Sequence, residues 1–305
     1  MPATLPSTPA SGVLRVQDSP AQATQKPAQP GELPADTAPE AAALWRSLCA
    51  TTRTPAAPDA RPPGALRAFD LSFDQRLRSG AQRNEFAARV RYLAPGFLRF
   101  RLESGREQMR GPTGDWLVDG DEAVRLRGRE HAEDRRQMDD WLAVAGNFVS
   151  LSDPASLHIN HMALVDKAPT PLPPQLADAA QDLRWLSVES PDFRLFLNES
   201  EDHGRQTLFS AYLGLDPGDS SLSLAVLHDI ELEKLPAQGP GSHGHRARTL
   251  LIQVLDQRPL DGYIIPRLMN IHQWLTDGFE RRPSMELFVV DGRLGGELDP
   301  TDFAP

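Results

Sequence analysis

Apolar and polar residues alternate along much of the chain from about residue 66, and this period of two predicts β-strands with one buried face. The alternation is clearest where arginines separate Leu98, Phe100 and Leu102. Asp119-Gly120 divides two short stretches and is a hairpin signal. The first half therefore reads as an antiparallel meander, whose apolar positions include Phe69, Leu71, Phe73, Phe86, Val90, Leu98, Phe100, Leu102 and Trp116.

The period then changes to that of a helix over residues 129–151, and a second short helix is predicted at 174–183. The apolar stripe of the first helix consists of Met138, Trp141, Leu142, Ala145, Phe148 and Val149. Strands resume after these helices, at 193–197, 207–213, 221–228, 249–255, 263–272 and 285–290. Asp261-Gly262 predicts a hairpin, and Asp291-Gly292 is expected to end the last strand.

A sheet of about ten strands usually curls, because twisted open sheets of that width rarely stay flat. The helices in the middle of the chain are then available to cover its concave side. The predicted fold class is α+β: a curved antiparallel half-barrel, or incomplete β-barrel, of about ten strands covered by helices.

The beginning of the chain has a different composition. Residues 1–38 are rich in Pro and Ala with few aliphatic residues, so we expect a disordered tail. A short helix is predicted at 39–50, where Ala41, Leu44, Trp45 and Leu48 recur at helical spacing. Residues 51–64 read as a linker, and residues 65–305 as the folded domain.

Composition narrows the classes of function. The formal net charge of −10 argues against a general nucleic-acid binder, which needs a concentrated basic face. No apolar run approaches the roughly 20 residues needed to span a bilayer, so no transmembrane segment is predicted. The single cysteine, Cys49, excludes an internal disulfide framework. Met1 is followed by Pro2 and Ala3 without a basic or apolar signal region, which leaves the cytoplasm and the cell envelope both open.

Four stretches, in this order, resemble the periplasmic outer-membrane lipoprotein carriers of the LolA/LolB-like family. The first is Phe69–Gln75, with its two aromatic residues and a Gln. The second is Val90–Phe100, an extended strand, a proline turn and an alternating apolar segment; before this proline the carriers have a basic residue and this chain has Ala94. The third is the hairpin at Trp116–Glu122, and the last is the polar closing segment Glu297–Phe303.

The resemblance implies an incomplete β-barrel closed by helices, with a hydrophobic cavity that accepts acyl chains and with neither catalytic residues nor a cofactor. It also implies a place in the periplasm or cell envelope, and a lipid or an acylated lipoprotein as the partner. The expected cavity residues are Phe69, Leu71, Phe73, Phe86, Val90, Leu98, Phe100, Leu102, Trp116, Trp141, Leu142 and Phe148.

Another interpretation of the same apolar residues stays open. The strands could simply pack against the helix stripe, as any sheet packs on a helix, leaving no ligand cavity. The protein would then be a non-catalytic interaction module that binds another envelope protein through its convex face or its tail.

Two histidine pairs raise the question of a metal site. His158 and His161 are three residues apart and could share a helical face, while His243 and His245 lie in a glycine-rich loop beside Ser242. Zinc needs a third or fourth ligand, and no zinc-protease motif or nucleophile elbow accompanies these residues. We therefore expect no metal and no catalytic site.

Overall fold

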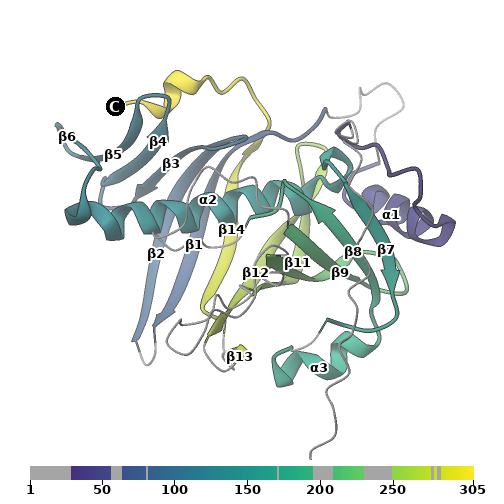
Figure 1. Ribbon diagram of the computed structural model, residues 1–305. Helices are drawn as coiled ribbons and strands as arrows, with labels where there is room; N and C mark the ends of the chain where they lie inside the picture. The colour runs from purple at the N-terminus through teal and green to yellow at the C-terminus, as the bar shows by residue number, and fades with distance from the viewer. Residues whose placement is uncertain are drawn as a thin grey trace, which may run out of the picture.

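A computed structural model of the chain describes residues 29–55, 64–79, 82–169, 172–194, 209–229, 249–275, 278–279 and 283–305. Its centre is one large antiparallel sheet, which bends around a long helix (Figure 1). The fold is the predicted α+β half-barrel: within the described residues the sheet does not close, and it runs from β6 at one edge to β7 at the other.

The described residues contain more strands than the expected ten. The strands are β1 (Ala68–Ser79), β2 (Gln82–Leu93), β3 (Phe97–Leu102), β4 (Glu107–Gly111), β5 (Gly114–Asp119), β6 (Glu122–Arg125), β7 (His161–Val165), β8 (Arg184–Ser190), β9 (Phe209–Leu215), β10 (Leu222–Asp229), β11 (Thr249–Leu260), β12 (Tyr263–Leu275), β13 (Gly278–Phe279) and β14 (Met285–Leu294). Their order in the sheet is β6-β5-β4-β3-β2-β1-β14-β12-β11-β10-β9-β8-β7, with β13 paired to β12. The last strand, β14, therefore lies beside β1 and joins the two halves of the sheet.

The helices are α1 (Pro39–Thr51), α2 (Ala132–Ser152) and α3 (Pro174–Gln181), with short 3-10 turns η1 (Arg129–His131), η2 (Pro154–Ser156) and η3 (Pro300–Phe303). The three helices found in the described part of the chain lie where the sequence pattern predicts them. None of the described helices is both long and apolar enough to cross a membrane.

The predictions for the two Asp-Gly pairs in the second half of the chain have different outcomes. Asp261 and Gly262 have φ angles of 46° and 88°, as a tight hairpin with two left-handed residues requires, and they join β11 to β12. The prediction that Asp291-Gly292 ends the last strand is wrong, because β14 continues to Leu294. Gly292 allows this continuation: at its φ of 135°, an added Cβ would lie 2.2 Å from the carbonyl oxygen of Asp70.

Four strands were missed, the fourth being the two-residue β13, and one was misplaced. The sequence pattern gives no signal for β4, β7 or β8. The indole of Trp185, on β8, packs in a second apolar cluster with Leu176 of α3, while the neighbouring Leu186 packs in the main core. A strand buried on both faces loses the alternation of apolar and polar residues. The predicted strand at 193–197 is absent from its described part, where Phe193 is instead a fully buried core residue.

The tail and linker are described only in part. Residues 29–38 differ from the expected disordered tail, because Leu33 packs against the core and the Gly31 amide donates to the Leu157 carbonyl at 3.0 Å. Residues 1–28 and 56–63 lie outside the described part of the chain. At the other end, η3 returns to the convex face, where Phe303 stacks on Phe97 with ring centroids 5.9 Å apart.

Candidate functional site

The concave face of the sheet carries a continuous apolar surface whose rows follow from the strand register. Phe69 lies opposite Tyr92 on β2, Phe73 lies opposite Ala88, and Val90 lies opposite Phe100 on β3. Side chains two residues apart on one strand share this face, so the odd positions of β1 from 69 to 77 all point inward. Figure 1 shows α2 crossing this face, with β1 and β2 continuing past it.

The helix α2 packs on one part of this face through aromatic rings. Phe148 meets Phe69 and Phe73 edge to face, with ring centroids 5.3 Å and 6.1 Å apart. Trp141 lies 5.9 Å from Phe73 and 4.7 Å from Phe100. We call the sheet positions under the helix the covered rows; they consist of Phe69, Leu71, Phe73, Val90, Leu98 and Phe100.

The predicted cavity residues fall into three groups. Nine are buried in the main core, namely the six covered-row residues with Trp141, Leu142 and Phe148. Phe86 and Leu102 are partly buried and pack against that core. Trp116 lies outside it: its strand neighbour Met109 faces away from α2, its indole donates to Thr113, and Arg125 lies 5.7 Å above its ring. Including Trp116 was wrong, and Leu117 is the β5 residue that packs against the core.

The rows beyond Phe73 lie outside the width of α2. A helix with its side chains is about 10–12 Å wide, which corresponds to three or four residues of a strand that it crosses. β1 is 12 residues long, so the helix covers only part of it. We call six of the remaining inward positions the distal rows; they consist of Gln75, Leu77, Phe86, Ile271, Met285 and Leu287. The exposed Asn84, opposite Leu77 on β2, lies at their outer end.

The distal rows are apolar apart from one residue. Ile271, Met285 and Leu287 are buried members of the main core, and Leu77 and Phe86 are partly buried against it. The exception is Gln75, whose side chain is 1% exposed and lies between Phe86 on β2 and Leu287 on β14. Within the described residues this region thus combines partly exposed hydrocarbon with one buried amide.

The first half of α2 is fastened to the sheet by polar contacts. The amide nitrogen of Gln108 donates to Asp134 and Gln137, at 3.2 Å and 2.9 Å. Arg110 pairs with Asp139 at 2.6 Å. On the same helix, burial raises the pKa of Asp140 to about 7, against the opposing effect of Arg136. This half of the helix therefore depends on charge, whereas the half from Trp141 onward depends on apolar burial.

A second polar group joins the ends of α1 and α2 to the sheet. Arg53 pairs with the fully buried Asp153 at 2.5 Å and lies 4.5 Å above the Tyr263 ring. The other oxygen of Asp153 accepts from the Leu66 amide at 2.8 Å. These contacts close the end of the barrel at which β1 begins.

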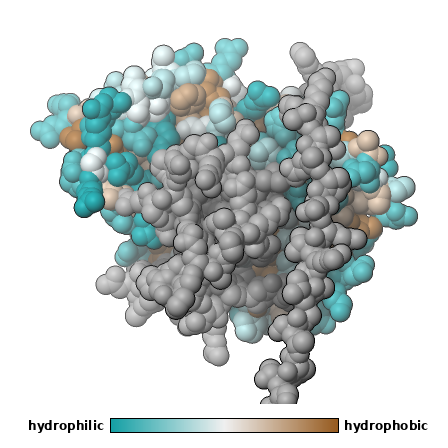
Figure 2. Space-filling view, in the orientation of Figure 1, coloured by the Kyte–Doolittle hydropathy of each residue, from teal (hydrophilic) through white to brown (hydrophobic). Residues whose placement is uncertain are grey.

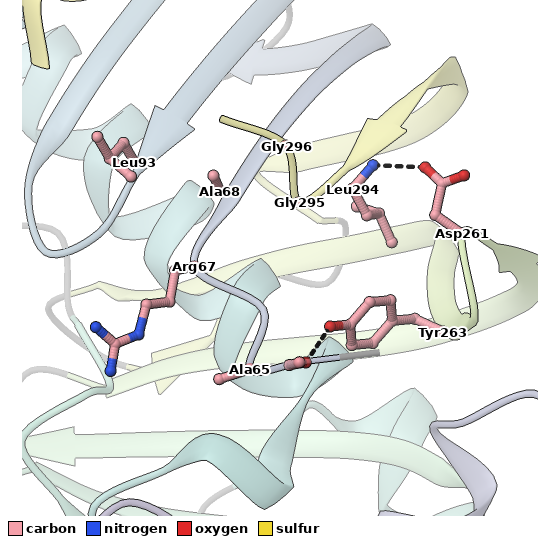
Figure 3. A pocket seen from close by; sticks show the side chains of 10 residues that line it. Ala65, Arg67, Ala68, Leu93, Asp261, Tyr263, Leu294, Gly295 and Gly296 are labelled. Atoms are coloured by element: carbon pink, nitrogen blue, oxygen red, sulfur yellow. Dashed lines mark hydrogen bonds between the residues drawn. The ribbon is translucent and has the colours of Figure 1, made fainter. Parts of the chain in front are cut away.

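A pocket of about 350 Å³ lies at this same closed end (Figure 3). It is lined by Gly64, Ala65, Arg67, Ala68, Leu93, Asp261, Tyr263, Leu294, Gly295 and Gly296. Two of its walls are fixed by hydrogen bonds, from the Tyr263 hydroxyl to the Gly64 carbonyl and from the Leu294 amide to Asp261. None of the predicted cavity residues lines it, and half of its ten lining residues are glycine or alanine, which offer little hydrocarbon to an acyl chain.

A basic side chain reaches the proline turn where the sequence has Ala94. Arg194, a hundred residues further along the chain, donates from its guanidinium to the Pro95 carbonyl. Asn147 of α2 holds the Arg194 backbone with two hydrogen bonds of 2.7 Å and 2.8 Å. Sequence reasoning missed this arginine, because no local pattern links it to the turn.

The histidines do not form a metal site in the described residues. Residues 157–160 are not helical and His161 begins β7, so the two side chains do not share a helical face. His158 instead contacts Asp192, with 3.0 Å between Nδ1 and the carboxylate. No group of three metal-ligating side chains occurs in the part of the chain that the structure describes. Ser242, His243 and His245 lie outside that part.

The described surface is mostly polar, and the large apolar side chains are mostly inside. Figure 2 shows that the described residues on one face are mostly hydrophilic, with hydrophobic residues in small separate groups. The large hydrophobic residues exposed in the described chain are Val124, Leu164, Leu255 and Val290, and they lie on different strands. Scattered residues of this kind are normal for a protein surface.

Comparisons with known proteins give similarities of fold. No family model matches the chain, and no curated protein matches it in sequence. Among solved structures, a LolA superfamily protein from Nitrosomonas europaea is 10% identical, with a TM-score of 0.43 over 87% of this chain and 97% of that one. An outer membrane lipoprotein-sorting protein domain from Vibrio parahaemolyticus is 11% identical, with a TM-score of 0.41 over 80% of this chain and 91% of that one.

A DUF1329 family protein from Desulfovibrio piger is also 11% identical, with a TM-score of 0.42 over 86% of this chain and 96% of that one. The first of the three descriptions names the family that the sequence motifs resemble. At identities this low and TM-scores below 0.5, function has to be argued from this chain's own residues.

Proposed function

We propose that the protein holds the hydrocarbon chain of a lipid-like ligand against the distal rows, without catalysing a reaction. The observation that carries the proposal is the extent of the apolar concave face: it continues past α2, and Leu77 and Phe86 remain partly exposed there. The predicted cavity thus moves from the covered rows, which the helix occupies, to the rows beside them.

The energy available is sufficient for such a ligand. Each buried methylene contributes about 0.8 kcal/mol, so a chain of a dozen carbons could supply on the order of 10 kcal/mol before entropic costs. An acyl chain is flexible and narrow, so it could lie along the distal rows. By the resemblance to lipoprotein carriers, we further propose that the ligand is a lipid or an acylated protein of the bacterial cell envelope.

The direct test is the binding of a fluorescent fatty acid, such as 11-(dansylamino)undecanoic acid, to delipidated protein. Phe86→Glu places a charge in the distal rows and should weaken binding at least about tenfold, since a buried unpaired charge is strongly unfavourable. Val290→Glu is the matched control, because Val290 is 41% exposed and should tolerate the same change. Circular dichroism would confirm that both variants fold.

Wild-type protein that binds no fatty acid would overturn the proposal. Native mass spectrometry provides an independent measurement, since a carrier should retain lipid when it is purified gently. A protein purified without lipid, and unable to bind the probe, would instead support the interaction module.

A further inference from the structure

Four arginines lie together on the convex face of the sheet, the face turned away from α2 (Figure 1). Arg89 and Arg91 of β2 are directly opposite Arg101 and Arg99 of β3. Buried residues alternate with them on both strands, so all four side chains point outward. Opposite Cβ atoms on paired strands are about 5 Å apart, and residues two apart on one strand are about 7 Å apart. We call this compact group the arginine quartet.

The arginine quartet is short of negative charge. Asp70 on β1 pairs with both arginines of β2, at 2.6 Å and 3.0 Å. Glu107 on β4 pairs with both arginines of β3, at 2.7 Å and 3.3 Å. On the other side of β1, Arg293 and Asp291 of β14 add one charge of each sign. Each of the two carboxylates is therefore shared by two guanidinium groups, and two positive charges are left in excess.

Stability does not explain this arrangement, because like charges directly opposite each other on paired strands destabilise a sheet. The same face shows that the fold can do otherwise. Further along β1, Arg76 lies between two carboxylates, at 3.3 Å from Glu85 and 3.5 Å from Glu286. There one arginine has two acidic partners, which is the opposite ratio to that of the quartet.

The two most exposed members of the quartet keep free hydrogen-bond donors. Arg89 and Arg101 are 57% and 60% exposed. Arg101 contacts its carboxylate through Nε, so within the described chain its two Nη atoms have no partner. Arg89 uses Nε and Nη2 on its carboxylate, which leaves Nη1 available. These donors lie on neighbouring strands and can reach one ligand.

Acidic residues bound the quartet. Asp74 follows on β1 and Glu103 follows β3, and both are exposed. On the other side lies η3, where the Asp302 carbonyl accepts from Arg99 at 3.3 Å. A wide anionic surface such as a membrane would meet these acidic residues as well. A single small anion would meet the arginines alone.

A phosphate group has the matching chemistry. Guanidinium groups bind phosphate through parallel N–H···O bonds, and a phosphate monoester carries a charge of about −1.5 to −2 at pH 7, close to the excess of the quartet. We infer that the arginine quartet binds a phosphate monoester group, from free phosphate or from a lipid headgroup. This site lies on the opposite face of the sheet from the distal rows, so the inference is independent of the proposed function.

The test is an NMR titration of the whole protein that follows the arginine Nε–H signals. Inorganic phosphate at pH 7.5 should shift the quartet signals in a saturable way, and sodium chloride of equal ionic strength should not. Arg101→Gln and Arg89→Gln should each weaken phosphate binding at least about fivefold, because each removes a charged donor. Arg76→Gln is the matched control on the same face, where Arg76 is 52% exposed, and it should leave the affinity within about twofold.

A second titration distinguishes the two sources of phosphate. It uses dihexanoyl phosphatidic acid and, as a control without a monoester, dihexanoyl phosphatidylcholine, both below their micelle concentrations. Tighter binding of phosphatidic acid than of inorganic phosphate would identify a lipid headgroup, and equal binding would identify the phosphate group alone.

Several outcomes would overturn the inference. They are shifts that depend on ionic strength alone, unchanged affinity in both quartet variants, or an equal loss in Arg76→Gln. The arginines would then form a structural ion-pair network. Fatty-acid binding should be the same in Arg101→Gln as in wild type, so this site and the proposed function can fail separately.

Discussion

The covered rows and the distal rows belong to the same strands and the same face, yet they differ in how they are completed. Phe69, Phe73 and Phe100 are closed by rings from α2. Gln75 and Phe86 lie one row further and have no such ring above them among the described contacts. The difference teaches that one helix is too narrow to complete a long curved sheet. We therefore expect the covered rows to contribute most to stability, and the distal rows are where we propose that a ligand binds.

The largest effect is expected at the centre of the covered rows. Phe148→Ala removes a ring that is 1% exposed and should lower the free energy of unfolding by about 4 kcal/mol. Phe86→Ala, on the partly exposed distal side, should cost clearly less. Urea unfolding of both variants measures the difference; equal losses would break the division between the two sets of rows.

The closed end of the barrel should be nearly as sensitive. Asp153→Ala leaves Arg53 and the Leu66 amide without their carboxylate and should destabilise the protein by about 3 kcal/mol. As a control, Asp256→Ala removes an exposed partner of Arg267 and should cost less than about 1 kcal/mol. A mild effect of Asp153→Ala would mean that the buried pair is not what fixes this end.

The covering helix should show a pH dependence. The pKa of Asp140 is raised to about 7, so the folded state favours the protonated carboxyl, and its contribution to stability is lost as the pH rises from about 4 to 7. Asp140→Asn should resemble wild type at pH 4 and be about 2 kcal/mol more stable at pH 8. Asp139→Asn, which loses the pair with Arg110, should instead be destabilising at pH 8. Thermal unfolding of both variants between pH 4 and pH 8 measures whether each one gains or loses stability relative to wild type.

The smallest change concerns a rate, with no effect on stability. Burial raises the pKa of the Cys49 thiol to about 12, so almost no thiolate is present at pH 8. Reaction with Ellman's reagent should then be at least about a hundredfold slower than in urea-unfolded protein. A fast reaction in the native state would show that α1 separates readily from the sheet. The end of the sheet at which β1 begins would then be less stable than its buried contacts indicate.

Much of the architecture could be read from the sequence. Where a strand has one wet face, as in β2 and β3, the arginines between apolar residues give its position and its inward side. The helix stripe of α2 was equally clear, and nine of the twelve predicted cavity residues do lie together in the core. Local periodicity suffices in these regions because one side of each element faces water.

Other features depended on residues distant in the chain. The strand β8 is covered on both faces, by α3 and by the core. Its sequence therefore lacks the alternation of apolar and polar residues from which a strand is predicted. The placement of Trp116 failed because a one-residue shift in register moves every side chain of a strand to the other face. Arg194 donates directly to the Pro95 carbonyl, and Asn147 of α2 holds the Arg194 backbone in place.

The sequence by itself determined which residues are apolar, in what period, and hence the type of all three described helices and of most strands. Only the tertiary structure decided that α2 lies over Phe73, one row before Gln75. A helix is narrower than β1 is long, and which part of the strand it covers depends on packing between elements distant in sequence. That relation separates the rows that the helix covers from the rows at which we propose that a ligand binds.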